Sequence, residues 1–172
     1  MIKVIDNFLA NTDYQMLKNL VYRQYDFGWR YTGVCNLKLQ PKEEVCEDKF
    51  NFQFVHILYN QNIPQSEYWS TILNPFMHQL NMKSLIQAKI NFTPVTHEIV
   101  EHCFHIDTED NTYKSSTAVY YLNTCDGYTK FETGEKVESV ANRIVVFPAT
   151  TRHSGTTCTN EQGRYVLNIN YF

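Results

Sequence analysis

Residues 164–172 read RYVLNINYF, and the alternation in this stretch decides the fold class. Successive side chains of a β-strand point to opposite faces. One face of this strand is apolar, whereas the other carries a guanidinium and two amides, which are costly to bury without partners. The stretch therefore predicts a strand that separates a hydrophobic core from a polar cavity. The apolar set is Tyr165, Leu167, Ile169 and Tyr171, and the opposite set is Arg164, Val166, Asn168 and Asn170.

Runs of the same kind recur along the chain from Ser84 onward. They are short, rich in β-branched and aromatic residues, and separated by turn residues. Short strands at this spacing indicate a β sandwich or barrel, and the aromatic content of 15% suits the pleated surface of a sheet. We therefore predict a mainly β fold of the α+β class. The expected strands cover residues 85–92, 98–105, 116–123, 129–131, 136–140, 143–147 and 164–172.

Two helical patterns precede most of these runs. Apolar residues three and four positions apart follow the capping cluster Asn11–Asp13 and predict an amphipathic helix that reaches Tyr25. A second helix is expected over residues 68–80, with Ser66 as its N-cap and Pro75 as the position of a kink. Both apolar stripes are interpreted as packing faces.

The stretch Gly28–Asp48 between the two helices has no clean period and is expected to be a long loop. Long loops in compact domains are often lids, so a substrate lid and a solvated connection are both open for this segment. The alternating Phe50, Phe52 and Phe54 predict a half-buried strand after it. Thr108–Lys114 is a second polar and aromatic segment at which we expect substrate contacts.

Length and composition limit the class of protein. The chain has 172 residues, of which 43% are hydrophobic and 19% are charged, and this balance suits one domain with a buried core. We assign a single domain over residues 1–172, with a helical support over about 1–83 and a β core over about 84–172. The net charge of −3 offers no cationic field for nucleic acids.

The sequence also bears on membrane association, secretion and the redox state of the cysteines. No apolar run approaches the roughly 18 residues needed to span a bilayer, and Asp6 interrupts the first apolar residues before a signal sequence develops. The five cysteines are odd in number and include no C-x-x-C pair, so reduced thiols are expected. We expect a soluble, cytoplasmic protein without nucleic-acid or membrane partners, and we make no prediction of its oligomeric state.

The tripeptide His105-Ile106-Asp107 ends one of the expected strands. Residues i and i+2 share a face of a strand, so the imidazole and the carboxylate converge while Ile106 points away. His153 is the best candidate for a third ligand, and two histidines with one carboxylate are typical of non-haem Fe(II) oxygenases. A His-x-Asp pair taken alone is more often a hydrogen-bonded surface pair. By parity, His102 points away from His105 and receives no role.

Arg164 follows His153 in the next strand pattern, so a hairpin-like return can bring its guanidinium near the metal. The arginine fork binds a carboxylate through two parallel hydrogen bonds. A metal with open coordination positions and an inward arginine together suggest a small dicarboxylate ligand.

Five motifs occur together in one order: His105-x-Asp107, Tyr120–Asn123, Gly127–Phe131, His153 and Arg164. This pattern resembles the Fe(II)- and 2-oxoglutarate-dependent dioxygenases, and within them the prolyl-hydroxylase branch. There, a Tyr-Leu-Asn strand end and a Gly-x-Thr-x-Phe element lie between the two metal histidines. The resemblance covers about residues 89–172, half of the chain. It implies a double-stranded β-helix, a jelly roll of about eight strands, with the two N-terminal helices on one outer sheet face.

The resemblance also implies roles for single residues. His105, Asp107 and His153 would be the iron ligands, and Arg164 would bind the distal carboxylate of 2-oxoglutarate. Tyr121 and Thr129 stand where relatives place a hydroxyl on the same carboxylate, and Asn91 stands on a strand that faces the cosubstrate.

The chain departs from the family pattern at three places. Val166 stands where many relatives have Ser or Thr two positions after the arginine, so Tyr121 or Thr129 must supply the neutral hydrogen bond. Asp126-Gly127 replaces a paired glycine. Asn170 stands where the alkylated-nucleobase demethylases have a second arginine, which disfavours that branch.

The activity that the resemblance implies is hydroxylation of a peptidyl proline or a small molecule, coupled to the decarboxylation of 2-oxoglutarate to succinate. The implied cofactors are Fe(II), 2-oxoglutarate and O2, with ascorbate as a candidate reductant. Two alternatives stay open. A non-catalytic, cupin-like metal-binding barrel would keep the triad but has no need for Arg164, and in a structural or partner-binding jelly roll the histidines and the aspartate would be incidental.

Overall fold

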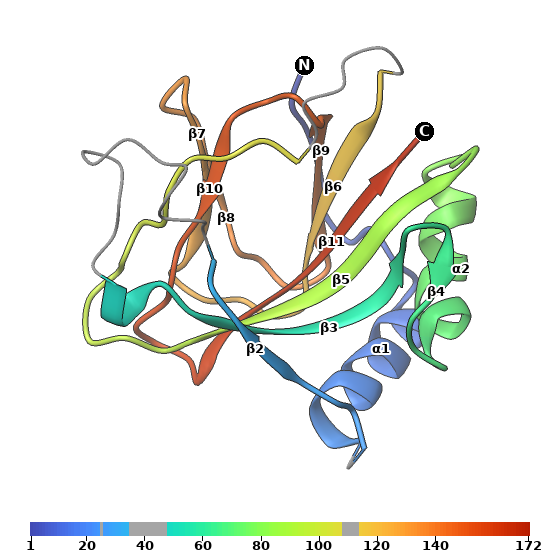
Figure 1. The fold of residues 1–172 in the computed structure, drawn as a ribbon, viewed down its shortest axis with the longest axis horizontal. Helices are drawn as coiled ribbons and strands as arrows, with labels where there is room; N and C mark the ends of the chain where they lie inside the picture. The colour runs from blue at the N-terminus through green and yellow to red at the C-terminus, as the bar shows by residue number, and fades with distance from the viewer. Residues whose placement is uncertain (25, 35–47, 108–113) are drawn as a thin grey trace.

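Two antiparallel β-sheets face each other, and two helices cover the outer side of the larger sheet (Figure 1). The computed structural model describes residues 1–24, 26–34, 48–107 and 114–172. Most of the expected loop Gly28–Asp48 and of the segment Thr108–Lys114 therefore lies outside the described residues, including the lid proposed from the sequence. Within the described ranges, neither helix has the length and apolar character needed to cross a membrane.

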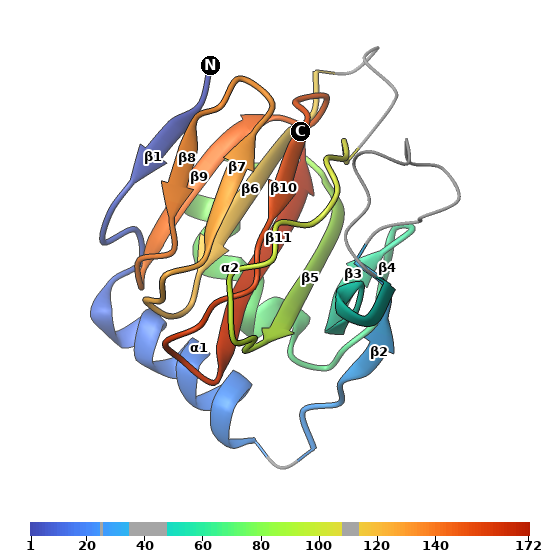
Figure 2. The ribbon, with the colours of Figure 1, turned by 90° about the vertical axis from the view of Figure 1, so that its left-hand side faces the viewer.

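The large sheet has eight strands, and the small sheet has three. In spatial order the large sheet consists of β1 (Lys3–Ile5), β9 (Arg143–Pro148), β6 (Ser116–Tyr121), β11 (Gly163–Tyr171), β5 (Leu85–Pro94), β3 (Gln53–Asn60) and β2 (Arg30–Thr32), and β4 (Ile63–Pro64) pairs with β3. The small sheet consists of β10 (His153–Gly155), β7 (Tyr128–Phe131) and β8 (Lys136–Glu138). In Figure 2 the small sheet lies in front of β9, β6 and β11.

The mainly β jelly-roll architecture expected from the sequence is confirmed. Six of the seven strands predicted from Ser84 onward are present, with ends that differ by at most two residues. Residues 98–105 are the exception, because they form two isolated bridges, from Glu101 to Thr156 and from His105 to His153, and no continuous strand. The alternation of apolar residues does not distinguish a full ladder of hydrogen bonds from single bridges along the neighbouring β10. The short strands β1, β2, β4 and β10 were not predicted.

Strands from both sides of residue 83 share the large sheet. The N-terminal β1 pairs with β9, and β3 pairs with β5. Residues 1–83, predicted as a helical support, therefore also contribute strands to the large sheet. Residue 83 marks a change in the sequence pattern and no boundary of the sheet.

The helices are α1 (Asn11–Arg23) and α2 (Trp69–Gln79). The predicted capping cluster Asn11–Asp13 lies inside α1, whose N-cap is Ala10 without a side-chain cap. Asp13 instead places a negative charge in the first turn, where the helix dipole favours it. The Ser66 hydroxyl accepts a hydrogen bond from the Tyr68 N–H at 3.2 Å, just before α2. Pro75 lies inside α2, as the sequence predicted.

The main hydrophobic core lies between the helices and the outer face of the large sheet. The alternation in β11 is confirmed: Leu167 and Ile169 are fully buried in this core, together with Leu17 of α1 and Phe76 of α2. The opposite face of β11 points into the barrel. A smaller apolar cluster lies there, formed by Val119, Tyr121, Phe131, Val137, Val145, Phe147 and Val166.

One buried asparagine ties the N-terminal segment to the sheet. The Asn142 Oδ1 accepts hydrogen bonds from the Leu9 N–H at 2.8 Å and from the Tyr120 hydroxyl at 2.9 Å, and its Nδ2 donates to the Leu9 carbonyl at 2.9 Å. Its backbone φ is +63°, in the left-handed region that favours glycine and asparagine.

We expect Asn142→Ala to lower the free energy of unfolding by about 3 kcal/mol, because three buried hydrogen bonds of about 1 kcal/mol each are lost. Asn142→Gly removes the same bonds and relieves the backbone, so it is expected to be about 1 kcal/mol less damaging than Asn142→Ala. Urea unfolding of the three proteins measures both differences. A loss below 1 kcal/mol in the alanine variant would contradict this account.

Candidate active site

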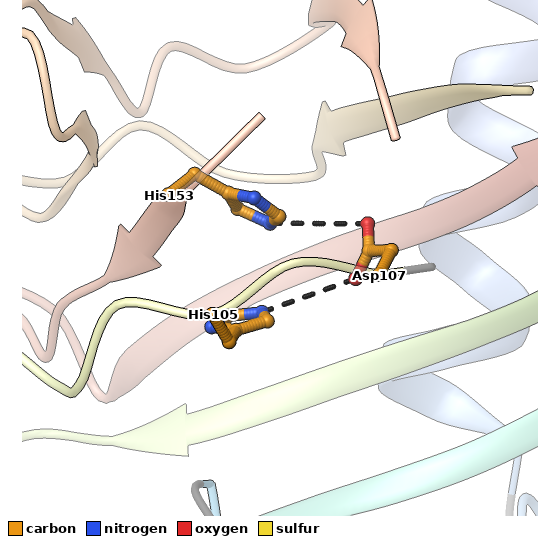
Figure 3. Close-up of side chains that lie close together, drawn as sticks. All are labelled: His105, Asp107 and His153. Atoms are coloured by element: carbon orange, nitrogen blue, oxygen red, sulfur yellow. Dashed lines mark ion pairs between the residues drawn. The ribbon is translucent and has the colours of Figure 1, made fainter. Parts of the chain in front are cut away.

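Three potential metal ligands meet inside the barrel. Ligand atoms of His105, Asp107 and His153 all lie within 4.8 Å of one another. Figure 3 shows the carboxylate of Asp107 to one side of the two imidazoles, with one oxygen facing each ring. The distance from His105 Nε2 to Asp107 Oδ1 is 3.9 Å, and that from His153 Nε2 to Asp107 Oδ2 is also 3.9 Å. These distances are too long for hydrogen bonds and short enough for one ion with bonds of about 2 Å.

One isolated β-bridge, made of two backbone hydrogen bonds, brings the two histidines together. The His105 N–H donates to the His153 carbonyl at 2.9 Å, and the His153 N–H donates back to the His105 carbonyl at 2.9 Å. Residues paired in this way lie directly opposite each other, and the two ring centroids are 4.4 Å apart. The convergence expected from a strand ending in His-x-Asp is therefore achieved by one isolated bridge.

Both imidazoles are oriented with Nε2 toward the carboxylate. His153 Nδ1 lies 2.9 Å from the Thr151 carbonyl, and His105 Nδ1 lies 3.4 Å from the Cys103 carbonyl. A carbonyl oxygen only accepts, so Nδ1 carries the proton and the Nε2 lone pair is free for a metal. Burial, together with the charge of His153, lowers the pKa of His105 to about 4. This imidazole is therefore neutral, as a ligand must be, at physiological pH.

Asp107 is held as a carboxylate by its neighbours. Burial by itself would raise its pKa, but the electrostatic effect of the adjacent His153 ring and a hydrogen bond from Thr117 outweigh this effect and keep the pKa below its usual value. The Thr117 hydroxyl donates to Asp107 Oδ2 at 2.5 Å, and Asn170 Nδ2 donates to the Thr117 hydroxyl at 3.1 Å. Asn170, on the polar face of β11, thus orients the carboxylate through Thr117.

Arg164 is 3% exposed and points into the same pocket. Its Nε donates to the Ser139 hydroxyl at 2.7 Å, and one terminal nitrogen donates to the Thr129 hydroxyl at 2.9 Å. Among the described residues, no carboxylate pairs with this guanidinium. A buried charge without a counter-ion is unfavourable, so the position suits an anionic ligand. Ser139 was not identified from the sequence, although it shares a face with the buried Val137 by the period of two.

Tyr121 and Thr129, the two candidates for a neutral hydrogen bond, lie together behind the guanidinium. The Tyr121 hydroxyl donates to the Thr129 hydroxyl at 2.8 Å, and its ring lies under Arg164 with 5.4 Å between the centroid and Cζ. Burial raises the pKa of Tyr121, so the phenol stays protonated. Thr129 lines the pocket and Tyr121 does not, which makes Thr129 the closer of the two to a ligand.

One pocket joins the triad to Arg164. It is lined by His105 and His153 of the triad as well as by Arg164. The register of β11 against β5 places Arg164 opposite Thr93, Val166 opposite Asn91 and Asn168 opposite Lys89. Asn91 is therefore midway along the pocket wall.

His102 also lines this pocket, contrary to the parity expectation, because residues 98–105 are not a regular strand. It is 5% exposed, and burial lowers its pKa. The two side-chain oxygens in the structure that are buried without a hydrogen-bond partner, among the described residues, are Oδ1 of Asn91 and Oδ1 of Asn168. Both residues line the pocket.

Comparison with solved structures identifies the fold. A prolyl hydroxylase from Trichoplax adhaerens, in complex with a hypoxia-inducible-factor peptide fragment, superposes with a TM-score of 0.64 at 12% identity, over 99% of this chain and 83% of that one. A prolyl-4-hydroxylase from Pseudomonas putida gives a TM-score of 0.64 at 15% identity, over 99% and 91%. The chain has the fold of the 2-oxoglutarate- and Fe(II)-dependent oxygenases.

This oxygenase fold is shared with enzymes of several chemistries. The alpha-ketoglutarate-dependent carbocyclase SnoK of nogalamycin biosynthesis superposes with a TM-score of 0.67 at 13% identity, over 99% of this chain and 78% of that one. No family model matches the sequence. No curated protein matches it either.

Proposed function

We propose that this protein is an Fe(II)- and 2-oxoglutarate-dependent dioxygenase that hydroxylates a small molecule or a peptidyl proline. The observation that carries the proposal is the pairing of two sites in one pocket. A His-Asp-His triad with converging ligand atoms lies near one end, and a buried arginine without a carboxylate partner lies at the other. The shared fold with prolyl hydroxylases supports it.

The donor set fits the proposed metal. Two neutral imidazole nitrogens and one carboxylate oxygen are the ligands of the facial Fe(II) site, which leaves positions for other ligands. We assign His105, Asp107 and His153 as these ligands. When bound, Fe(II) and 2-oxoglutarate supply the oxidising chemistry, in which O2 is consumed, 2-oxoglutarate is decarboxylated to succinate and a C–H bond is hydroxylated.

The residues of the chain bind and orient the reactants. Arg164 offers its remaining N–H groups to the distal carboxylate of 2-oxoglutarate, and Thr129 supplies a neutral hydroxyl beside it. Ser139 fixes the guanidinium by accepting from Nε. The N–H group of the Asn91 amide faces the middle of the cosubstrate. Val166 opposite Asn91 gives an apolar wall that excludes water between the two ends.

The cupin-like alternative does not account for Arg164. A barrel that only binds a metal gains nothing from a buried guanidinium that has two hydroxyl partners and, among the described residues, no acid. The structural alternative likewise leaves the converging Nε2 atoms unexplained.

The test is the turnover of 2-oxoglutarate with Fe(II), O2 and ascorbate as reductant. Succinate should form and should be abolished in His105→Ala. Anaerobic addition of Fe(II) and 2-oxoglutarate should also give the charge-transfer absorbance of a chelated keto acid. A protein that binds iron but neither develops this absorbance nor consumes 2-oxoglutarate belongs to the cupin-like class.

Gly127 lets the backbone approach Arg164 closely. A Cβ at this position would lie 2.6 Å from the Thr157 carbonyl oxygen and 2.8 Å from Arg164 Cδ. Both the backbone at Thr157 and the Arg164 side chain must shift to relieve these contacts, so we expect Gly127→Ala to weaken 2-oxoglutarate binding roughly tenfold, or about 1.4 kcal/mol. Anaerobic titration of the absorbance measures this.

Gly28→Ala is the matched control, because an added Cβ there meets no atom within 4 Å. It should bind 2-oxoglutarate as the wild type does. Equal binding by both alanine variants would show that the guanidinium does not depend on this close approach.

A further inference from the structure

The pocket holds a second cation besides Arg164. Lys89 lies on β5 directly opposite Asn168 of β11, and its half-buried side chain lines the pocket. No described residue forms a hydrogen bond or an ion pair with its ammonium. The same pocket is lined by His105 and His153 of the triad. An unpaired ammonium beside the triad indicates an anion that binds there.

The proposed cosubstrate complex does not neutralise Lys89. In that complex the two charges of Fe(II) and the one of Arg164 are matched by the carboxylate of Asp107 and the dianion of 2-oxoglutarate. The positive charge of Lys89 then has no negative partner among these groups. Because partial burial of an ammonium without a counter-ion is unfavourable, Lys89 favours a further ligand that brings a carboxylate or another anionic group to it.

The amides beside Lys89 lack hydrogen-bond donors. Asn168 Oδ1 and Asn91 Oδ1 are buried and accept no hydrogen bond. Asn168 lies across from Lys89, and Asn91 lies two positions further along β5 on the same face. The dianion of 2-oxoglutarate has only acceptor oxygens, so it cannot satisfy these atoms. Their partner must bring an N–H or O–H group.

We infer that the compound oxidised at this site is a free α-amino acid, whose carboxylate binds Lys89 and whose ammonium binds the side-chain oxygens of Asn168 and Asn91. The inference rests on the proposed function and selects the small-molecule substrate over the peptidyl one. An α-amino acid carries both charges on one carbon, and directly opposed residues on paired strands have Cβ atoms only about 4.5–5.5 Å apart. A residue in mid-peptide has neither charge and would leave Lys89 unpaired.

The experiment is an anaerobic titration of the Fe(II) and 2-oxoglutarate complex with each of the standard L-amino acids. Binding is followed by the change in the charge-transfer absorbance, which needs no turnover. Each amino acid that binds is compared with its carboxamide and its N-acetyl derivative. We expect at least one amino acid to bind, and to bind at least tenfold more tightly than either derivative.

Variants assign each preference to its residue. Lys89→Met should abolish the preference for the acid over the carboxamide, and Lys89→Arg should retain it. Asn168→Leu should abolish the preference for the free amine over the N-acetyl form. Lys83→Met is the matched control, because Lys83 is an exposed lysine that donates to Asn81 outside the pocket. Both preferences should persist in it.

The outcomes separate the two hypotheses. If no charge-transfer absorbance develops, the proposed function fails and the inference fails with it. If the absorbance develops but no amino acid changes it, or the carboxamide binds as tightly as the acid, only the inference is overturned. A Lys89→Met variant that weakens 2-oxoglutarate and leaves the acid preference intact would also overturn it, because Lys89 would then be a cosubstrate ligand.

Discussion

Arg164→Met is expected to raise the KM for 2-oxoglutarate roughly 100-fold while Fe(II) binding stays intact. Loss of one partner from a buried, hydrogen-bonded charge pair costs about 3 kcal/mol, which corresponds to this change in affinity. The guanidinium is enclosed by Ser139 and Thr129, so water cannot replace it easily. Initial rates of succinate formation against 2-oxoglutarate concentration measure the effect.

The same variant should remain folded without the cosubstrate. Among the described residues Arg164 has no acid partner, so replacing it by an apolar side chain of similar length should change the free energy of unfolding by no more than about 1 kcal/mol. Arg143→Met is the matched control, because Arg143 forms an exposed ion pair with Asp6 at 2.5 Å. An unchanged KM in Arg164→Met would remove the arginine from the cosubstrate site.

Asp107→Ala is expected to abolish succinate formation and to weaken metal binding by at least about 100-fold. The variant loses the one carboxylate of the triad, and changes to the groups that merely hydrogen-bond to metal ligands already cost about 10–100-fold in affinity. Anaerobic titration with Mn(II), followed by electron paramagnetic resonance, measures the affinity without any turnover.

The control for this variant is Asp26→Asn. Asp26 is an exposed aspartate that accepts a hydrogen bond from the Tyr68 hydroxyl at 2.9 Å, far along the sequence from the triad. It should bind Mn(II) as the wild type does. Tight Mn(II) binding by Asp107→Ala would place the metal elsewhere.

The local pattern of the sequence was sufficient to predict most of the sheet. The alternation in residues 164–172 assigned Leu167 and Ile169 to the core and Arg164 and Asn168 to the pocket, as the structure has them. This succeeds because one strand buried on one face and lining a cavity on the other carries both signals in its own residues. Residue types and spacing, together with the resemblance to the dioxygenases, singled out His105, Asp107 and His153, which the structure brings close together.

The parts that were missed depend on contacts between distant segments. Ser139 reaches Arg164 because the small sheet folds over the large one, and no local pattern encodes that contact. His102 lines the pocket because its segment follows β10 by isolated bridges, so that strand parity does not apply. The N-cap of α1 was misplaced because Asn11–Asp13 contains the residue types that caps prefer, although the helix begins at Asn11 itself.

The triad links the two sheets of the barrel through the side chain of Asp107. His153 belongs to β10 of the small sheet, whereas Asp107 is anchored through Thr117 to β6 of the large sheet. An ion bound to His153 and Asp107 would connect the two sheets. Because the ion binds the folded barrel and not the unfolded chain, its binding would raise the free energy of unfolding. The melting temperature should therefore climb with Mn(II) concentration in the wild type and stay flat in Asp107→Ala, even where no keto acid or oxygen is present.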